Sequence, residues 1–287
     1  MHYKKYKSIL SPQNGMNIYR GCTHGCIYCD SRSKCYRIEH AFEDIEVKVD
    51  APQMLEAELV RKRKKCMIGT GSMTDPYIPL EEKIMYTRRC LEVIERHGFG
   101  VSIITKSARI LRDLELLKSI NRKAKCVIEI TLTTFDEDLC KILEPNVATT
   151  KERFEVLKVL RDNGIPTVVW LCPLLPYIND TEENLRGILG YCFEAKVWGI
   201  LNFSIGVTLR EGDREYFYAA LDRHFPGLRQ KYMRKYGNSY IVNSDNNDYL
   251  MGIFYDECKK HGVVCDNREI FNFMHTLPET YEQLSLF

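Results

Sequence analysis

Short apolar segments alternate with longer amphipathic segments over the first two hundred residues, and this alternation constrains the fold more than any other feature. The short segments are rich in apolar and β-branched residues and predict strands. Alternating strands and helices form parallel sheets with right-handed crossovers. The sequence therefore predicts an α/β fold, a partial (β/α)6 TIM-type barrel, with strands at 16–19, 66–70, 101–105, 126–133, 167–172 and 199–204.

The predicted helices fill the intervals, at about 52–64, 80–97 and 108–123. Thr149 and Glu152 form a capping box for a helix that ends near 163–164, and Asp180 with Glu183 caps the next. After Gly206 the pattern becomes mainly helical, with segments around 215–223, 227–236, 248–261 and 267–273. We expect an N-terminal extension (1–13), the barrel (14–205), a helical C-terminal extension (206–278) and a tail (279–287).

The amino-acid composition indicates the compartment in which the protein is expected. The chain has 12 cysteines in 287 residues and a net charge of +2, which indicates neither the presence nor the absence of nucleic acid. It has no apolar run of membrane-spanning length and no apolar stretch of a signal peptide at its N-terminus. Cysteine-rich chains without such a signal are typical of reducing compartments, so we expect a cytoplasmic protein with no membrane association.

Three cysteines lie on one short loop, Cys22-Thr23-His24-Gly25-Cys26-Ile27-Tyr28-Cys29. Thiolates are the usual ligands of iron–sulfur clusters, and three of them leave the fourth iron of a cubane free to bind another ligand. The loop follows the first predicted strand, at the edge where barrel enzymes carry their active sites. The alternatives are a zinc site with His24 as fourth ligand, or chance clustering in a cysteine-rich chain.

The cysteine spacing, with Tyr28 before the last cysteine, resembles the signature of the radical SAM superfamily. Over about residues 14–205 the chain resembles the spore photoproduct lyase-like branch of that superfamily. The likeness rests on segments 17–22, 69–77, 104–107, 132–137 and 143–145. It implies a [4Fe-4S] cluster that, once reduced, cleaves S-adenosylmethionine to methionine and a 5′-deoxyadenosyl radical, which abstracts a hydrogen atom from the substrate. It also implies a one-electron reductant such as flavodoxin or ferredoxin.

The resemblance assigns further residues to S-adenosylmethionine. Tyr28 would contact the adenine, and Thr70, Gly71 and Ser72 would hold the methionine amino group. Lys106 would pair with the carboxylate or ribose, and Thr131 would contact the ribose. For Lys106 and Thr131, simple solvation at a strand end is an alternative.

Two positions depart from the family pattern. Ser72 stands where members that repair spore photoproduct carry a cysteine as hydrogen-atom donor, and Asp30 stands where an aromatic residue usually follows the third cluster cysteine. Both departures argue against repair of spore photoproduct. Cys172, at the end of the fifth strand, is a candidate relocated donor, although burial before Pro173 is the favoured interpretation.

The tail Gln283-Leu284-Ser285-Leu286-Phe287 resembles the pentapeptide that binds the bacterial sliding clamp. The resemblance implies that Leu284, Leu286 and Phe287 fill apolar pockets and that the Gln283 amide forms hydrogen bonds. The alternative is an apolar tail folded over the mouth of the barrel.

A clamp partner would connect the enzyme with DNA, so nucleic acid is the preferred substrate class, as a lesion or a modified base. Basic runs at 61–65 and 229–236 would suit backbone contacts, although a solvated helix face is the favoured interpretation. The alternative enzyme is a maturase of peptides or proteins. A third reading, a clamp-bound adaptor without activity, conflicts with the intact cysteine triad.

Overall fold

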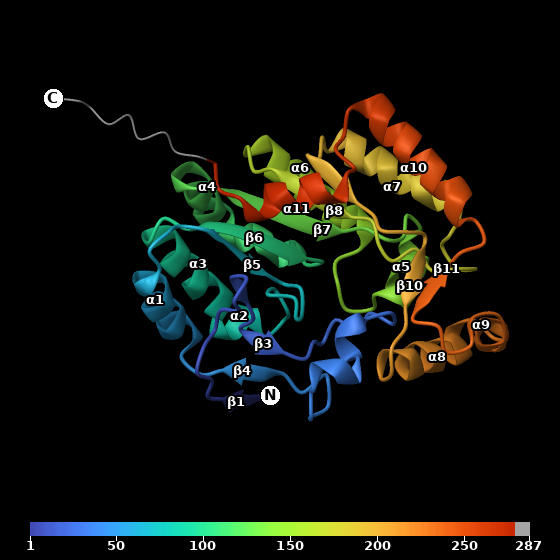
Figure 1. Ribbon diagram of the computed structural model, residues 1–287, viewed down its shortest axis with the longest axis horizontal. Coiled ribbons are helices and arrows are strands. Elements are labelled where there is room, and N and C mark those ends of the chain that lie inside the picture. Colours follow the sequence, from blue (N-terminus) through green and yellow to red (C-terminus); the bar gives the residue numbers. More distant parts are fainter. Residues whose placement is uncertain (279–287) are drawn as a thin grey trace.

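A computed structural model describes residues 1–278 of the chain. Its centre is a six-stranded parallel sheet with the strand order β2-β5-β6-β7-β8-β9, so neighbours in the sequence are neighbours in the sheet (Figure 1). Each crossover places a helix on the outer face, which is the arrangement of a partial barrel. The strands are β2 (Gly15–Met16), β5 (Met67–Thr70), β6 (Gly100–Thr105), β7 (Cys126–Thr131), β8 (Thr167–Trp170) and β9 (Gly199–Leu201).

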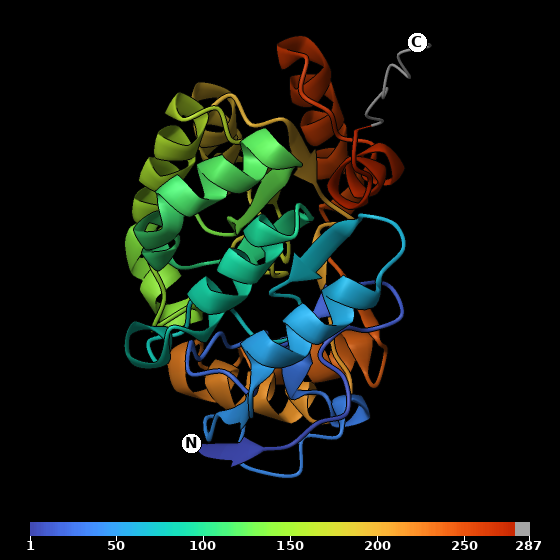
Figure 2. The same ribbon diagram turned by 90° about the vertical axis from the view of Figure 1, so that its left-hand side faces the viewer.

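The outer helices lie in series along one side of the sheet (Figure 2). They bury apolar residues against the sheet, and every residue of β7 is buried, as expected for a parallel strand covered on both faces. The covering elements are α1 (Ala51–Arg61), α2 (Glu81–Ile84), α3 (Tyr86–Arg96), α4 (Leu114–Lys123), α5 (Glu137–Leu143), α6 (Thr150–Asp162) and α7 (Glu182–Glu194), with a 3₁₀ helix at Ala108–Asp113.

The predicted partial barrel is confirmed, and so is the capping box of α6, in which Thr149 and Glu152 bond each other's backbone. The predicted cap of α7 is wrong by one residue. The Thr181 hydroxyl accepts from the backbone N–H of Asn184, while the Asp180 carboxylate is bonded by the hydroxyl of Ser244.

The predicted helix 80–97 is divided at Met85, which has a left-handed backbone conformation (φ 55°). The cause is the fully buried carboxylate of Glu81, which accepts the backbone N–H of Thr87 at 2.7 Å and starts α3. The same carboxylate pairs with Arg112 at 3.1 Å and accepts the hydroxyl of Tyr19. Partners this far away in the sequence leave no local signal.

The predicted strand 16–19 is also divided. The chain leaves the main sheet after Met16, and β3 (Tyr19–Arg20) pairs antiparallel with β4 (Glu46–Lys48), which in turn pairs parallel with β1 (His2–Lys4). This small sheet lies below the barrel next to the N-terminus (Figure 1). It carries the start of the cysteine loop, and the loop continues into 3₁₀ turns at Asp30–Arg32 and Lys34–Tyr36.

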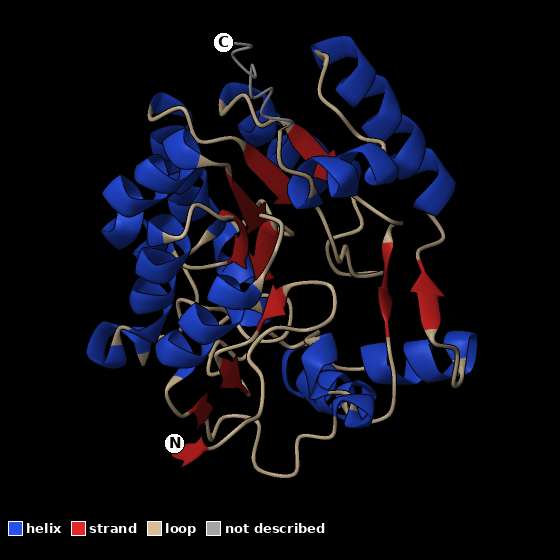
Figure 3. Cartoon of the chain, turned by 60° about the vertical axis from the view of Figure 1, so that its left-hand side comes forward, coloured by secondary structure: helices blue, strands red, loops and turns tan. Residues whose placement is uncertain are grey.

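Residues 206–278 pack in two places. The antiparallel pair β10 (Gly206–Thr208) and β11 (Ile241–Asn243) stands apart from the main sheet, with α8 (Asp213–His224) and α9 (Leu228–Tyr236) between its strands in the sequence (Figure 3). By contrast, α10 (Asn247–His261) packs beside α7, and α11 (Asn267–His275) covers the end of β9. The segment is mainly helical, but the sequence analysis missed its two strands. In the part of the chain that the structure describes, none of the helices is long and apolar enough to cross a bilayer.

Candidate active site

The cysteine loop is fixed by backbone bonds to distant segments. The N–H of Cys22 donates to the carbonyl of Phe42 at 2.9 Å, and the N–H of Ile27 donates to that of Leu143 at 3.0 Å. Asn146 donates from its backbone to His24 O and from its side chain to Thr23 O, both at 3.1 Å. The chain around the end of α5 therefore holds the cysteine loop in place. Residues 143–145, which the sequence analysis singled out, belong to this part of the chain.

Gly21 starts the loop in a conformation that only glycine adopts easily here. Its φ is +83°, and a Cβ atom would lie 2.3 Å from the carbonyl oxygen of Phe42. The first cysteine follows directly, so this close approach sets where the thiol stands relative to the small sheet.

The thiols are set up for a cluster rather than for a single ion. Burial raises the pKa of the Cys22 thiol to about 12, and burial also raises the pKa of Cys26 and of Cys29. Deprotonated thiols at this place therefore need a metal to stabilise them. Thiolates around one zinc ion lie about 4 Å apart, since each Zn–S bond is ~2.3 Å. Within residues 1–278, the three thiols do not all lie within 4.8 Å of one another, whereas ligand atoms of His2, His40 and Asp44 do.

A small cavity of about 130 Å³ adjoins the three thiols. His24 is 3% exposed, and its Nε2 has no hydrogen-bond partner within the described chain, although its Nδ1 lies 3.6 Å from Asp75. Burial lowers the pKa of His24, so the ring is neutral. A buried ring nitrogen without a partner fits a polar ligand in this cavity. The remaining walls include Gly71, Ser72, Lys106 and Thr131.

Gly71, Ser72, Lys106 and Thr131, four of the residues expected to bind S-adenosylmethionine, therefore line this cavity, whereas Tyr28 and Thr70 do not. Thr70 ends β5 and is 7% exposed, but it does not line the cavity. Gly71 has φ +104° and passes so close to β6 that a Cβ would lie 2.0 Å from the carbonyl oxygen of Ile104. This contact brings Ser72 to the cavity edge.

Asp75 organises this wall, and the sequence analysis gave it no role. Its carboxylate accepts the hydroxyl of Thr105 at 2.8 Å, the backbone N–H of Lys106 at 2.8 Å and that of Tyr77 at 2.8 Å. The bonds fix the end of β6 and thereby the direction of Lys106. The position of Asp75 in the family-like segment 69–77 was the signal that could have found it.

A buried charge network lies behind Tyr28. The Tyr28 hydroxyl donates to Glu144, and Glu144 pairs with Arg153, which is fully buried and also donates to Thr131 O at 2.6 Å. Burial disfavours the charge on Glu144, but Arg153 and Lys106 hold its pKa below the ordinary value. The Tyr28 hydroxyl is thus engaged away from the cysteines, and the ring remains for contact with a ligand.

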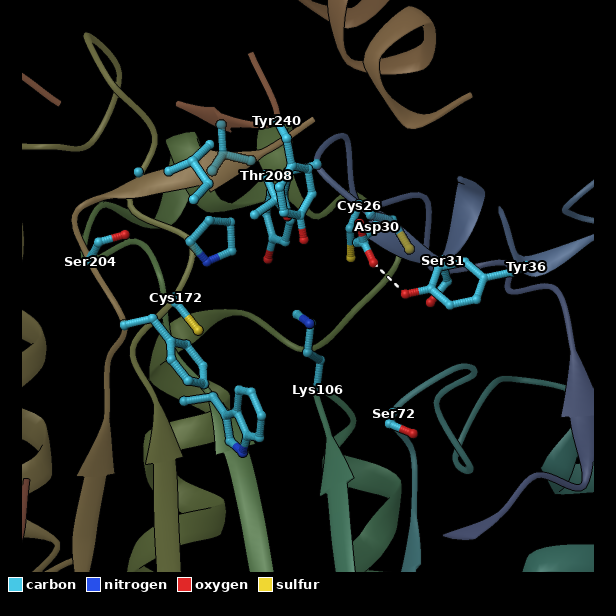
Figure 4. Close-up of a pocket in the computed structure, with 18 residues that line it drawn as sticks. Cys26, Asp30, Ser31, Tyr36, Ser72, Lys106, Cys172, Ser204, Thr208 and Tyr240 are labelled. Atoms are coloured by element: carbon cyan, nitrogen blue, oxygen red, sulfur yellow. Dashed lines mark hydrogen bonds between the residues drawn. The ribbon is translucent and has the colours of Figure 1, made fainter. Parts of the chain in front are cut away.

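Lys106 connects this network with a second, larger cavity of about 550 Å³ (Figure 4). Burial opposes the charge on Lys106, but the charges of Cys26 and Glu144 outweigh it and raise the pKa. Cys26, Tyr28 and Cys29 form one wall of the larger cavity. The opposite walls come from β8, β10 and β11 and from the loops that follow β8 and β9.

Aromatic side chains surround the outer part of the large cavity. Phe203 is 56% exposed and Tyr240 is 44% exposed, while the Trp170 ring lies 6.0 Å from that of Phe203. Arg210 stacks over Tyr240 at 4.6 Å and lies 3.7 Å from Asp30. The sequence analysis missed these aromatics, because they meet only through the pairing of β8 with β9 and of β10 with β11.

Two positions discussed above lie on these walls. Cys172 follows β8 and its sulfur points into the large cavity, where the residue is partly buried, so its role as a relocated donor stays a prediction (Figure 4). Burial raises the pKa of this thiol to about 12, which keeps it protonated. Asp30, found where an aromatic was expected, accepts the hydroxyl of Tyr36 at 2.6 Å (Figure 4). The tail residues Gln283, Leu284, Leu286 and Phe287 lie outside the described residues.

The sequence profile described as the radical SAM superfamily matches residues 16–187, and the chain belongs to that superfamily. An uncharacterised protein of Mycobacterium tuberculosis is 28% identical over 232 residues, which cover 77% of this chain and 66% of that protein. An uncharacterised protein of Methanocaldococcus jannaschii is 31% identical over 169 residues, covering 58% and 62%. The chain thus spans slightly less than two thirds of these relatives.

Among solved structures, spore photoproduct lyase complexed with dinucleoside spore photoproduct has a TM-score of 0.58 at 12% identity, with 85% of this chain and 71% of that chain covered. This likeness concerns the fold. The cofactors of this superfamily are a [4Fe-4S] cluster and S-adenosylmethionine, and the cysteine triad with the adjoining polar cavity fits both groups.

Proposed function

We propose that this enzyme abstracts a hydrogen atom from a nucleic-acid substrate, as a step in repair or modification of DNA. The observation that carries the proposal is the aromatic-lined cavity of about 550 Å³ beside Cys26 and Cys29. Aromatic faces at the mouth of a cavity suit nucleobases, because every base has a face that stacks. Enzymes that act on a base take it out of the helical stack and into a pocket.

The outer aromatics have the exposure that a stacking surface needs. Phe203, Tyr240 and Ile241 are each more than 40% exposed, and Trp170 lies deeper. The guanidinium of Arg210 next to Tyr240 offers a positive charge for a backbone phosphate. A related fold is known in complex with a dinucleoside, which agrees with a substrate of this class.

In this proposal, different residues hold the cluster and S-adenosylmethionine. A bound and reduced cluster would supply one electron for cleavage of S-adenosylmethionine, and the 5′-deoxyadenosyl radical from that cleavage would remove the hydrogen atom. Cys22, Cys26 and Cys29 would hold the cluster, and Tyr28, Gly71, Ser72, Lys106 and Thr131 would hold S-adenosylmethionine. Asp75 fixes Lys106 through its backbone N–H.

Cys172 is the candidate donor that returns a hydrogen atom to the substrate radical. Its S–H bond would break, the substrate would gain a C–H bond, and a sulfur-centred radical would remain. One electron and one proton, supplied through the one-electron reductant that serves the cluster, would restore the thiol. Ser72 is a poor substitute, because a hydroxyl gives up a hydrogen atom far less readily than a thiol.

The test is anaerobic reconstitution with dithionite and S-adenosylmethionine, followed by measurement of 5′-deoxyadenosine with no substrate, with single-stranded DNA, with duplex DNA and with a peptide mixture. We expect DNA to raise 5′-deoxyadenosine formation and to acquire a mass change. Stimulation by peptides and not by DNA would contradict the proposal and favour the maturase.

Two further parts of the proposal concern partners and location. The tail 283–287 would bring the enzyme to DNA through the sliding clamp, and flavodoxin or ferredoxin would supply electrons. We place the protein in the cytoplasm, because none of the 12 cysteines, all within the described residues, forms a disulfide and the reduced cluster needs a reducing compartment.

A further inference from the structure

A cavity of about 240 Å³ lies on the other side of the cysteine loop, against the small sheet. Arg20 and Gly21 from the start of the loop and Ile38 from the segment after it form part of the wall. The rest comes from Tyr6, Asn17, Lys48, Met73 and Thr74. The cavity shares only Met73 with the small cavity beside the three thiols, so the two are separate sites.

Two cations face this cavity without a carboxylate partner. Lys48 is 8% exposed, and no hydrogen bond or ion pair of its Nζ is present within residues 1–278. Its Nζ lies 4.7 Å from the centre of the Tyr6 ring. Arg20 donates to the carbonyls of Tyr36 at 2.7 Å and Arg37 at 3.1 Å and to the hydroxyl of Tyr6 at 3.3 Å, and within residues 1–278 it forms no ion pair. A buried cation is costly unless it is paired.

The nearby acids are already engaged. Glu46 accepts the hydroxyl of Tyr6 and pairs with Lys4 at 3.2 Å. Glu58 accepts two backbone N–H groups, from Ile9 at 2.8 Å and Leu10 at 3.2 Å. Burial and then the charge of Arg20 lower the pKa of Lys48, which shows that these acids do not compensate for its surroundings.

Uncharged donors complete the wall. Thr74 is 7% exposed, and its hydroxyl oxygen has no hydrogen-bond partner within the described chain. Asn17, whose side chain carries an amide, borders the same space, whereas the hydroxyl of Tyr6 already donates to Glu46 and accepts from Arg20. A cavity with two unpaired cations, an unpartnered hydroxyl and an amide matches an acceptor-rich anion.

We propose that this cavity binds a phosphate group, as inorganic phosphate or as the phosphate of a small phosphomonoester. The volume is below the range of about 300–1,000 Å³ that holds larger ligands, so the charged group itself occupies the site. Its walls belong to both ends of the cysteine loop. A bound phosphate therefore links Arg20, before the loop, with Lys48 of β4 and Thr74 after β5.

The test is calorimetric titration of the anaerobic, cluster-loaded protein with inorganic phosphate, adenosine 5′-monophosphate and adenosine, in a phosphate-free buffer. We expect phosphate or the monophosphate to bind at millimolar concentration or below, and adenosine not to bind. Tighter binding of the monophosphate identifies a phosphomonoester, and tighter binding of phosphate identifies the free ion. Absence of binding of both anions at tens of millimolar overturns the proposal.

Variants localise the site. Lys48→Met keeps the apolar stem and removes the charge, and we expect binding to weaken roughly 10- to 100-fold, as for loss of a charged hydrogen bond. Lys7→Met, at an exposed position near by, is the matched control and should change nothing. Thr74→Val, which removes only the hydroxyl, should weaken binding by a smaller factor and serves as a second probe if the Lys48 variant does not fold. Unchanged affinity in both variants, or displacement of the anion by saturating S-adenosylmethionine, overturns the proposal.

Discussion

The two sides of the active-site cavity are built differently. On the cysteine side, charged groups are buried and paired: Asp75 receives three hydrogen bonds, and Glu144 and Arg153 form an ion pair with no exposure. On the opposite side, Phe203, Tyr240 and Ile241 are more than 40% exposed, and β10 and β11 pair only with each other. The difference indicates that the residues proposed to hold the cofactors are fixed by buried contacts, whereas the proposed substrate wall is exposed to solvent.

The largest effect should come from the cluster ligands. Cys22→Ala should reduce the iron content of anaerobically reconstituted protein from about four per chain to near zero, because two thiolates on the loop cannot hold a cubane. Iron analysis and the visible absorption spectrum measure the loss. Cys66→Ala, at a half-buried position away from the loop, is the control. Stoichiometric zinc without iron in the unmodified protein would refute the cluster.

The second prediction concerns the donor. The protein should not repair spore photoproduct at a useful rate, because Ser72 stands where a thiol is expected. Cys172→Ser should stop product formation on the true substrate, while 5′-deoxyadenosine still forms, since hydrogen abstraction precedes donation. Product analysis beside 5′-deoxyadenosine separates the two steps. Efficient repair that survives the Cys172 substitution would show that neither residue has the proposed role.

The rigid side should be sensitive to loss of one charge. Arg153→Met leaves Glu144 buried without its partner, so the free energy of unfolding should fall by about 3–5 kcal/mol. Arg109→Met removes an exposed pair with Glu82 and should change it by less than about 1 kcal/mol. Denaturant titration of both variants measures the contrast. Equal small effects would mean that the buried network does not stabilise the cysteine side.

The exposed side should be tolerant in stability and sensitive in binding. Phe203→Ala should leave the midpoint of unfolding almost unchanged, because the side chain is 56% exposed. It should weaken use of a DNA substrate roughly 5- to 150-fold, the equivalent of about 1–3 kcal/mol for a stacked base. Tyr255→Ala removes an equally exposed aromatic of α10 and serves as control. Equal rates for the Phe203 and Tyr255 variants on the DNA substrate would contradict the proposal that Phe203 stacks on a base.

Deletion of the tail should have the smallest effect on the chemistry at the two sides of the active-site cavity. Deletion of residues 283–287 should leave cleavage of S-adenosylmethionine intact while abolishing binding to bacterial sliding clamp. Three apolar side chains and a few hydrogen bonds, less the cost of ordering a peptide, correspond to a dissociation constant on the order of micromolar. Calorimetry with a tail peptide provides the measurement. Loss of cluster chemistry on deletion, without clamp binding, would indicate that the tail packs on the barrel instead.

The sequence by itself determined the features that have a local pattern. Six strands could be predicted because buried parallel strands are continuous apolar runs, and the capping box of α6 because its two residues are three apart. The triad Cys22, Cys26 and Cys29 was recognisable because all ligands lie on one loop. Even so, the divided strand after Met16 and the break at Met85 escaped prediction, since β3 pairs with the distant β4 and Glu81 is held by the distant Tyr19 and Arg112.

Only the tertiary structure decided which polar groups meet. Asp75 reaches Lys106 through the register of β5 with β6, and Arg153 reaches Glu144 across two helices. In the aromatic wall, Trp170 and Phe203 meet through the pairing of β8 with β9. Tyr240 joins them through the pairing of β10 with β11, whose strands are separated by two helices in the sequence. Lys48 and Thr74 face one cavity because β4 and the segment after β5 are brought together by the folded chain. Such contacts depend on chain packing at long range, and a local sequence pattern does not encode them.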